Sequence, residues 1–355
     1  MGREIVGLKI GASRLSAARL SMNGSAELRQ LAEEPLPYGV FAGGEVKDAD
    51  ALGAALKDFF KKHKLPKRNV RVGVANNRIG VRTIELSGIS DPKQISNAVR
   101  FRAQEALPIP VEQAVLDYQV LSEGTDEKGV PVKKVLLVVA YRELIDSYVS
   151  ACRTAGVRLV GIDLEAFALL RALVATNGAP AAAEAERAAL VAVAIGSDRS
   201  TLAVSDGLTC EFTRVLDWGG RSLTTAVARA LEVDADEAER IKRAISLQGP
   251  EAPEGLSPEQ LAKAQEALQV GMQTFGRELV SSLQFYQSQE GSLGIREVVL
   301  AGGGAQLGGF AAAVQQLIGV TVRVADPLQG VSVGKKVKGE GGPAVAVPIG
   351  LGMGA

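Results

Sequence analysis

Two short glycine turns, one in each half of the chain, carry the residues best suited to bind an anion. The first is Gly11-Ala12-Ser13, which follows the apolar strand Val6–Ile10, and the second is Gly196-Ser197-Asp198, which follows Val191–Ile195. Each turn leads into a return strand. Glycine tolerates positive φ and leaves backbone N–H groups free to face an anion. The repeat predicts two related domains whose turns face one shared cleft.

The first hairpin belongs to a predicted mixed sheet with a helix packed on it. The helix is predicted at Ala49–Lys62, with Asp48 as its N-cap and apolar side chains at helical spacing. Strands are predicted around it at Ile5–Ile10, Leu15–Leu20, Glu27–Glu34 and Val70–Ala75. The order β-β-β-α-β is typical of a mixed sheet covered by a helix.

A second pattern predicts a small α+β insert over residues 79–160. Its predicted elements are the strand Val81–Leu86, the helix Ser90–Gln104, the strands Val115–Leu121 and Val132–Tyr141, and the helix Arg142–Ala155. The strand Val157–Leu164 and the helix Ala166–Val174 then return to the first domain. An insert of roughly eighty residues is near the lower end of domain size.

The second half of the chain begins after Asn177–Glu186, a Gly/Pro turn followed by small residues that predicts a domain boundary. Beyond the second hairpin, elements are predicted at Thr209–Leu216, Ser222–Leu231, Asp234–Ile245, Ser257–Gln289, Val298–Leu300, Leu307–Ile318 and Val320–Val324. Ala344–Met353 is predicted as a terminal helix. Pro348 argues against this prediction, because proline disfavours helix interiors.

The composition excludes several classes of protein. The 40 Lys and Arg residues balance 40 Asp and Glu residues, which argues against a bulk nucleic-acid binder. Cys152 and Cys210 lack metal-ligand spacing, and we expect buried thiols in a reducing cytosol. The sequence shows neither a targeting segment nor an apolar run of ~18 residues, so membrane attachment would need another protein.

Several stretches together carry a resemblance over nearly the whole chain. They are Gly7–Ser13, Glu34–Pro37, Ala98–Arg100, Leu107–Pro110, Val115–Tyr118, Asp163–Ala168, Ser282–Tyr286 and Gly302–Leu307. In this order and spacing, they resemble the PilM family of type IV pilus assembly proteins, which are actin-like and related to FtsA. No single stretch identifies the family without the others.

The resemblance implies an α/β chain with the actin/Hsp70-like ATPase fold. Each of two lobes would hold a mixed sheet flanked by helices, and an FtsA-type subdomain (1C) would be inserted in the first. The implied boundaries are residues 1–78 plus 161–180 for the first lobe (1A), 79–160 for the insert, and 181–355 for the second lobe, with about 220–295 forming subdomain 2B of its 2A/2B pair.

The resemblance also implies a nucleotide site for ATP or ADP. The two glycine turns would hold the phosphates, the triple-glycine turn would lie against the adenosine, and a Glu and a Lys one helical turn apart would reach the base and ribose. Backbone N–H groups and close backbone approach suit these roles. The matching residues are Lys9, Gly11, Ala12, Ser13, Gly196, Ser197, Thr201, Gly219, Gly220, Glu239, Lys242, Gly302, Gly303, Gly304 and Leu307.

The chain departs from the family pattern where hydrolysis needs carboxylates. Lys9 and Ala194 occupy the two core acidic positions, and Asp198 and Asp217 lie near but not at them. Because carboxylates hold Mg²⁺ and orient the attacking water, their loss predicts poor hydrolysis and little dependence on Mg²⁺. Lys9 would pair either with a phosphate or with a neighbouring carboxylate. Both readings stay open at this point.

Plainer interpretations compete for some residues. Glu239 and Lys242 have the spacing of an ordinary surface pair on a helix, worth a few tenths of a kcal/mol. The basic stretch Lys61-Lys62-His63-Lys64 has the character of a solvated helix end, and the loop with Lys335, Lys336 and Lys338 that of a solvated turn, with anionic lipid as the alternative.

The function implied by the resemblance is that of a cytoplasmic adaptor at the inner face of the cytoplasmic membrane. It would bind the N-terminal tail of the membrane protein PilN in a groove between first lobe and insert, near Val70–Ala75 and Val81–Leu86, and couple the pilus motor ATPase to the membrane complex. Self-association stays open. The alternatives are an active ATPase or phosphotransferase of the same superfamily, and a type II secretion component similar to GspL.

Overall fold

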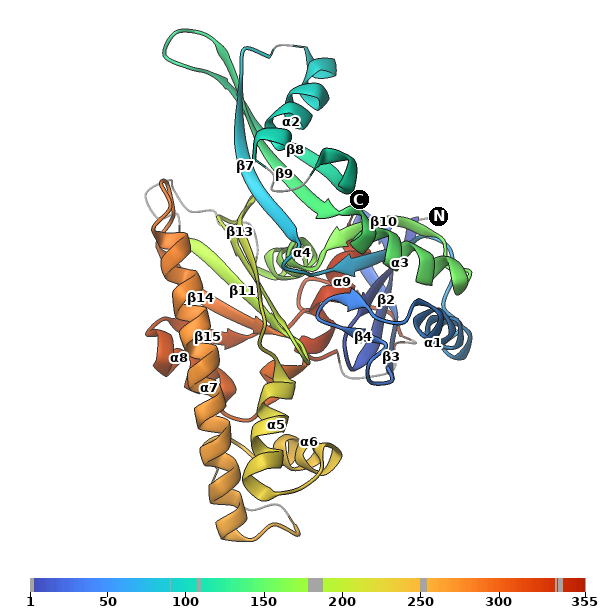
Figure 1. Cartoon of the computed structure of the whole chain (residues 1–355), viewed down its shortest axis with the longest axis vertical. Helices are drawn as coiled ribbons and strands as arrows, with labels where there is room; N and C mark the ends of the chain where they lie inside the picture. Colours follow the sequence, from blue (N-terminus) through green and yellow to red (C-terminus); the bar gives the residue numbers. More distant parts are fainter. Residues whose placement is uncertain are drawn as a thin grey trace.

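The computed structural model describes residues 3–89, 91–106, 110–177, 188–249, 254–335, 337 and 341–354. They form two lobes side by side, with a small insert standing above the first lobe (Figure 1). Four predicted features lie at least partly outside the described residues: Ser90, the Leu107–Ile109 part of the family motif, the boundary after Asn177, and the loop lysines Lys336 and Lys338.

The first lobe is a six-stranded sheet covered on both faces. Its strand order is β10-β6-β1-β2-β3-β16, and β1 runs parallel to β6 and antiparallel to β2. The strands are β1 (Arg3–Ile10), β2 (Arg14–Asn23), β3 (Ser25–Pro35), β6 (Val70–Val74), β10 (Leu159–Leu164) and β16 (Ser332–Val333). A short ribbon of β4 (Phe41–Ala42) and β5 (Glu45–Val46) leads into the first helix.

Helix α1 (Ala49–Lys62) has the predicted boundaries and cap. The side chain of Asp48 accepts a hydrogen bond from the Ala51 N–H, and the predicted apolar stripe is buried against the sheet. The predicted helix is therefore confirmed. It could be predicted from the sequence because the cap and the apolar period are both local signals.

The insert is a three-stranded antiparallel sheet with a core of its own. Its order is β7-β9-β8, formed by β7 (Ile79–Ser87), β8 (Ala114–Thr125) and β9 (Pro131–Tyr141). Helix α2 (Pro92–Ala106) packs Ile95, Val99 and Ala103 on one face, and a short turn η1 (Val111–Gln113) follows it.

Helix α3 (Arg142–Thr154) corrects the predicted extent of the insert, which included it. Its buried Tyr148 and Ala151 belong to the first-lobe core, and the helix packs beside α1. The helix and its amphipathic face agree with the prediction to within one residue, but the sheet that this face covers could not be predicted from local spacing.

The second lobe has the strand order β13-β12-β11-β14-β15 and a helical extension. Its strands are β11 (Ala189–Ile195), β12 (Ser200–Ser205), β13 (Cys210–Leu216), β14 (Ile295–Ala301) and β15 (Thr321–Val324). Its helices are α5 (Gly220–Leu231), α6 (Ala235–Ala244), α7 (Pro258–Gln287) and α8 (Phe310–Ile318). A short 3₁₀ turn η3 (Gly303–Gln306) precedes α8, which starts later than the predicted Leu307 because Gly309 is its N-cap and lies in the left-handed region, with φ +79°.

The C-terminal segment corrects the predicted lobe boundary, which placed residues 181–355 together. Strand β16 pairs with β3, and after the turn η4 (Pro343–Val345) helix α9 (Ala346–Met353) packs on β1, β2 and α4 (Glu165–Asn177). Helices α4 and α9 cover one face of the first sheet, while α1 and α3 cover the other. The chain therefore ends in the first lobe.

Candidate functional site

The two glycine turns have the same local geometry. The Gly11 N–H donates to the Arg14 carbonyl at 3.0 Å, and the Gly196 N–H donates to the Arg199 carbonyl at 2.8 Å. Each turn therefore closes three residues after its glycine, at the carboxyl end of a central strand. Ala12 is buried in the first-lobe core, and Ser13 is exposed at the turn.

Lys9 is paired with a carboxylate that the sequence analysis did not single out. Its Nζ lies 2.8 Å from Oε2 of Glu165, with the two side chains 19% and 7% exposed. Glu165 follows β10, which lies parallel to β6 and hence to β1 in the same sheet. The carboxyl ends of parallel strands meet at one edge of a sheet, and this signal could have found the pair. Of the two open readings for Lys9, this structure contains the carboxylate pair.

Ala194 lies in a close-packed seam between the lobes. It is buried on β11 beside Ala203 of β12 and Ala301 of β14, in a cluster that also includes residues of α4 and α9. The two core acidic positions of the family pattern, held here by Lys9 and Ala194, therefore supply no carboxylate to bind a metal.

The second turn rests on the first turn of α5. The Gly220 N–H donates to the Gly196 carbonyl at 2.9 Å, and the Arg221 N–H donates to the Ser197 carbonyl at 2.7 Å. A Cβ built on Gly219 would lie 2.6 Å from the Ser197 carbonyl oxygen, so only glycine fits there without rearrangement. Gly219 and Gly220 thus hold the turn in place.

Glu239 and Lys242 belong to a half-buried hydrogen-bond network and are more than a solvated surface pair. Lys242 Nζ donates to Oε2 of Glu239 at 2.5 Å, to Oγ1 of Thr224 at 2.9 Å and to the Gly220 carbonyl at 3.2 Å. Burial alone would raise the pKa of Glu239, but hydrogen bonds from Lys242, Thr224 and Arg243 outweigh it and lower the pKa to about 2. The network ties α6 to the start of α5, and Thr224 is a member that sequence reasoning missed.

The triple-glycine turn packs against the end of β11. Gly302 has φ +83°, and its Cβ would lie 2.3 Å from the Ile195 carbonyl oxygen. A Cβ on Gly304 would lie 2.2 Å from the Ile195 side chain, whereas a Cβ on Gly303 would meet no atom within 4 Å. Leu307 closes the turn with a 3.3 Å hydrogen bond to the Gly304 carbonyl. Gly302 and Gly304 are therefore required by packing, and Gly303 presents an open face.

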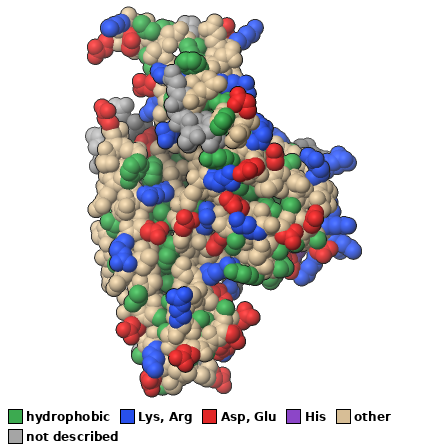
Figure 2. All heavy atoms as spheres, viewed as in Figure 1, with side chains coloured by type: hydrophobic (Ala, Val, Ile, Leu, Met, Phe, Trp, Pro, Cys, Tyr) green, Lys and Arg blue, Asp and Glu red, His purple; other side chains and the backbone are tan. Residues whose placement is uncertain are grey.

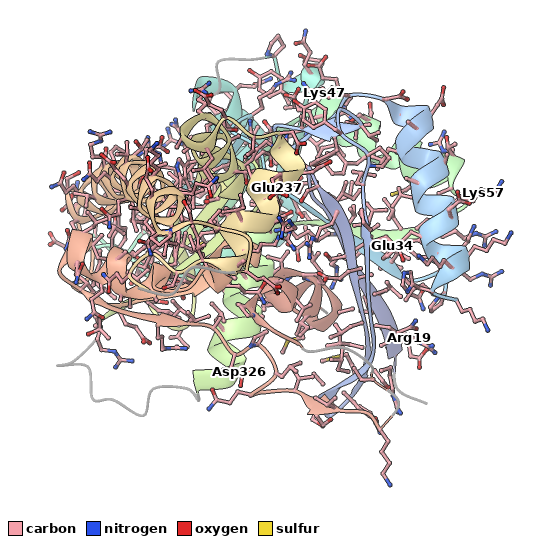
Figure 3. All side chains as sticks on the ribbon, turned by 90° about the horizontal axis from the view of Figure 1, so that it is seen from below. Arg19, Glu34, Lys47, Lys57, Glu237 and Asp326 are labelled. Carbon is pink, nitrogen blue, oxygen red and sulfur yellow. The ribbon has the colours of Figure 1, made fainter. Side chains whose placement is uncertain are left out.

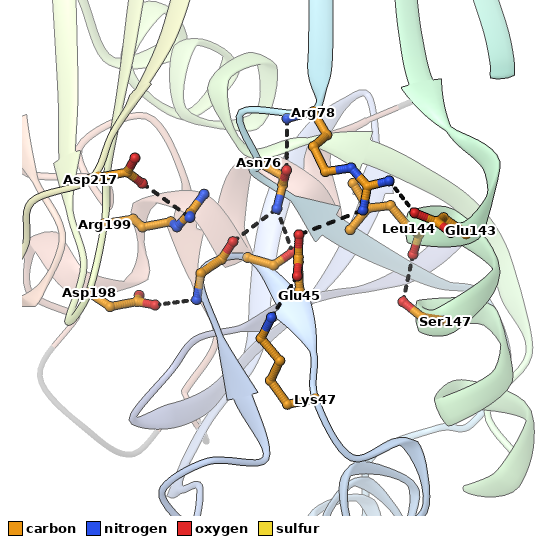
Figure 4. A network of polar contacts seen from close by, with 12 residues as sticks. Glu45, Lys47, Asn76, Arg78, Glu143, Leu144, Ser147, Asp198, Arg199 and Asp217 are labelled. Atoms are coloured by element: carbon orange, nitrogen blue, oxygen red, sulfur yellow. Dashed lines mark hydrogen bonds and ion pairs between the residues drawn. The ribbon is translucent and has the colours of Figure 1, made fainter. Parts of the chain in front are cut away.

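Asp198 and Asp217, the weak metal candidates, contact the opposite lobe. Oδ2 of Asp198 accepts from the Gly43 N–H at 2.7 Å. Asp217 accepts from Asn77 Nδ2 at 3.0 Å and pairs with Arg199 Nη2 at 3.1 Å. Figure 4 shows the two aspartates reaching from the second lobe toward the Asn76 side of the first. We call these contacts the interlobe clasp.

The clasp is anchored within the first lobe. Asn76 Nδ2 donates to the Gly43 carbonyl at 2.9 Å, and the Tyr148 hydroxyl donates to the Gly44 carbonyl at 3.0 Å. Arg199 Nη1 is buried and has no hydrogen-bond partner among the described residues. Across the same residues, no group of three or more His, Cys, Asp or Glu side chains could hold a metal ion.

Two cavities follow each other along the start of α4. The smaller, about 190 Å³, lies between β6, β7 and the β12–β13 pair, where Val74, Ala75, Ile79 and Val81 line it together with the buried Thr201. Thr201 pairs with Ala194 across β11 and β12, close to the second glycine turn, and contributes to the lining of this cavity. This cavity contains residues of the predicted groove region.

The larger cavity, about 460 Å³, is a groove between the insert, α4 and the β12–β13 turn. Its apolar lining includes Leu121, Leu136, Phe167, Leu170 and Leu208. The groove also contains half-buried Cys210, and burial raises the pKa of its thiol to about 12, as it does for buried Cys152.

Among the residues that the structure describes, no helix is both long and apolar enough to cross a membrane.

Comparison with known proteins gives one family over nearly the whole chain. The profile of the family described as "Type IV pilus assembly protein PilM" matches residues 7–353. The cell division protein FtsA of Bacillus subtilis (strain 168) is 24% identical over 319 residues, which cover 80% of this chain and 70% of FtsA.

Solved structures with similar folds agree. A PilM–PilN type IV pilus biogenesis complex matches with a TM-score of 0.82 and 26% identity, covering 99% of this chain and 98% of the other. The ethanolamine utilization protein EutJ of Carboxydothermus hydrogenoformans matches with a TM-score of 0.58 and 14% identity, covering 99% of this chain and 90% of EutJ. MreB5 of Spiroplasma citri bound to AMPPNP matches with a TM-score of 0.57 and 12% identity, covering 98% of this chain and 94% of MreB5. The predicted actin-like fold is confirmed.

Proposed function

Because this chain belongs to the PilM family of type IV pilus assembly proteins, we propose that it is an adaptor that binds the N-terminal tail of a PilN partner. The similar complex of PilM with PilN supports this partner. The adaptor would work at the cytoplasmic face of the inner membrane and couple the pilus motor ATPase to the membrane complex. The family match over residues 7–353 is the observation that carries the proposal.

We place the peptide in the larger groove between the insert and α4. An extended peptide needs apolar pockets for alternate side chains, and the groove supplies them from three elements. Arg171 adds a cation that already pairs with Asp163 and donates to the Gly350 carbonyl at 3.1 Å. A peptide there would contact insert, first lobe and second lobe together, so its binding would depend on how they are placed.

Leu208→Asp should weaken binding of the PilN tail 10- to 100-fold, the loss expected when one leucine no longer buries its side chain. Leu208 is 76% exposed at the groove rim, so the substitution should leave the fold intact. Fluorescence anisotropy with a labelled PilN N-terminal peptide measures the affinity. Val270→Asp is the matched control, since Val270 is 59% exposed on α7. Equal affinity in Leu208→Asp would reject this groove, and no binding by the natural chain would reject the adaptor itself.

We also propose that the cleft holds ATP or ADP without needing Mg²⁺ and without efficient turnover. Two cations flank it: Lys9, paired with Glu165, and Arg199, whose Nη1 has no described partner. Gly303 leaves an open face beside the second turn, suited to a base lying against the backbone. The positions of Lys9 and Ala194, and the engagement of Asp198 and Asp217 in the clasp, argue against an active ATPase or phosphotransferase.

Nucleotide at about a hundred times its Kd should add ~2.7 kcal/mol to the free energy of unfolding, with or without Mg²⁺. Thermal unfolding with ATP, ADP or neither measures the gain. Gly303→Val should abolish the gain but keep the stability of the nucleotide-free protein. Gly124→Val is the control, because a Cβ there also meets no atom within 4 Å. If neither nucleotide raised the free energy of unfolding, the cleft would not bind nucleotide, and the proposal would be rejected.

A further inference from the structure

One end of the first lobe carries a group of exposed cations that the proposed peptide groove and nucleotide cleft do not use. Figure 2 shows Lys and Arg side chains gathered along the margin formed by α1 and α3, and Figure 3 shows Lys57 pointing outward from α1. We call this the basic end. Its exposed members are Lys57, Lys61, Lys64, Arg68, Arg153 and Arg158.

The basic end joins three segments that are distant in sequence. Lys57 and Lys61 lie one turn apart on α1. The Arg158 N–H donates to the Lys67 carbonyl at 2.7 Å, and Lys67 Nζ donates to the Ala155 carbonyl at 2.8 Å at the end of α3. These contacts hold the loop after α1 against the segment between α3 and β10. The cations therefore lie on one surface, at the amino ends of β6 and β10 and away from the turn at Gly11.

The positive charge of this surface is largely uncompensated. None of the six cations forms a salt bridge with any residue that the structure describes, and the neighbouring Glu34 is already engaged by Lys62 and His63. On α1, the exposed acidic residue Asp58 lies between Lys57 and Lys61. Because the whole chain is neutral, this clustering is a local feature and not a consequence of composition.

Lys64 occupies a backbone position that usually belongs to glycine. It follows the C-cap His63 with φ +52°, and the next N–H, of Leu65, donates to the Phe60 carbonyl at 3.0 Å. This is the left-handed C′ position of a helix end, where a lysine is strained. A cation therefore occupies this position although its backbone is strained there.

We propose that the basic end docks on a membrane surface rich in anionic phospholipid. Lysine is a compact point charge that needs no oriented partner, which suits a fluid layer of headgroups. The aromatic residues of the same stretch, Phe59 and Phe60, are buried, so the surface offers no stacking platform for single-stranded nucleic acid. This proposal does not depend on the peptide groove or the nucleotide cleft.

The expected affinity is weak but useful. Each cation near an anionic surface contributes roughly fivefold, so six give an association constant on the order of 10⁴ M⁻¹ in accessible lipid. Such binding is marginal alone. It becomes effective when a second attachment, such as a membrane-anchored partner, raises the local concentration. The basic end would therefore set which face of the protein lies on the bilayer.

Flotation of the whole chain with vesicles tests the proposal. The protein should float with phosphatidylcholine vesicles that contain phosphatidylglycerol and not with phosphatidylcholine alone, and ~1 M salt should remove the binding. The triple variant Lys57→Gln, Lys61→Gln, Arg153→Gln should bind about 100-fold more weakly. The matched control, Lys93→Gln, Arg229→Gln, Arg277→Gln, neutralises three exposed cations elsewhere and should bind normally.

Three outcomes would overturn the proposal. The natural chain could fail to float with the anionic vesicles. The two triple variants could bind them equally, which would assign lipid binding to another surface. The vesicles could be ignored while soluble polyglutamate binds the natural chain and not the first triple variant, which would assign the basic end to an acidic protein.

Discussion

Glu165→Leu should lower the free energy of unfolding by about 3–5 kcal/mol. Glu165 Oε2 lies 2.8 Å from Lys9 Nζ, and both side chains are mostly removed from water between the first sheet and α4. Removing one partner of a buried pair leaves an uncompensated charge, and that penalty exceeds the net contribution of the intact pair. Urea unfolding followed by circular dichroism measures the change.

Two further variants separate the pair from the position. Lys9→Met with Glu165→Leu removes both charges and should recover most of the lost stability, because an apolar pair of similar volume has no charge to desolvate. Glu259→Leu breaks an exposed pair with Lys263 on α7 and should leave stability unchanged. If Glu165→Leu proved as mild as Glu259→Leu, water would reach Lys9, and the lysine would be free to meet a phosphate.

Local signals in the sequence are enough for much of the fold. The N-caps Asp48, Asp234 and Ser257 each accept a hydrogen bond from the third residue after them, and the three helices begin within one residue of their predicted starts. The two hairpins follow from short apolar strands around a glycine turn. Each of these features depends on residues within a few positions of one another.

Where the terminal helix packs and which residue pairs with Lys9 depend on distant contacts, and the sequence did not predict either. Helix α9 contains Pro348 and two glycines in eight residues, a composition that disfavours a helix. It forms because nearly all its residues are buried against the first sheet and α4, so tertiary packing overrides propensity. Lys9 and Glu165 are likewise separated by 156 positions, and only the sheet brings them together.

The candidate site shows the same division. The sequence located the glycine turns and the Glu239–Lys242 pair, since their spacing is local. It could not show that Asp198 would reach the Gly43 N–H or that Asp217 would reach Asn77, because these contacts cross between lobes. The clasp engages both aspartates with the polypeptide, and a metal ion would have to compete with these contacts.

Gly350→Ala should lower the free energy of unfolding by about 3 kcal/mol, although alanine is the better helix former by ~1 kcal/mol. A Cβ on Gly350 would lie 1.7 Å from the Ala168 carbonyl oxygen, so α9 and α4 would have to move apart. Backbone atoms cannot yield as a side chain can. Opposite this contact, a Cβ on Gly7 would lie 2.1 Å from the Pro348 carbonyl oxygen, so α9 is confined on both sides.

Gly352→Ala is the matched control in the same helix. Its Cβ would meet a terminal methyl of Leu20 at 2.5 Å, and a side chain can rotate away, so the loss in stability should be small. Because α4 also carries Phe167, Leu170 and Arg171 in the groove, Gly350→Ala should weaken binding of the PilN tail as well, whereas Gly352→Ala should not. Urea unfolding and peptide anisotropy on both variants separate the effects. A Gly350→Ala protein with natural stability would mean that α4 and α9 are not held this closely, and natural affinity in a destabilised variant would mean that the peptide does not depend on the position of α4.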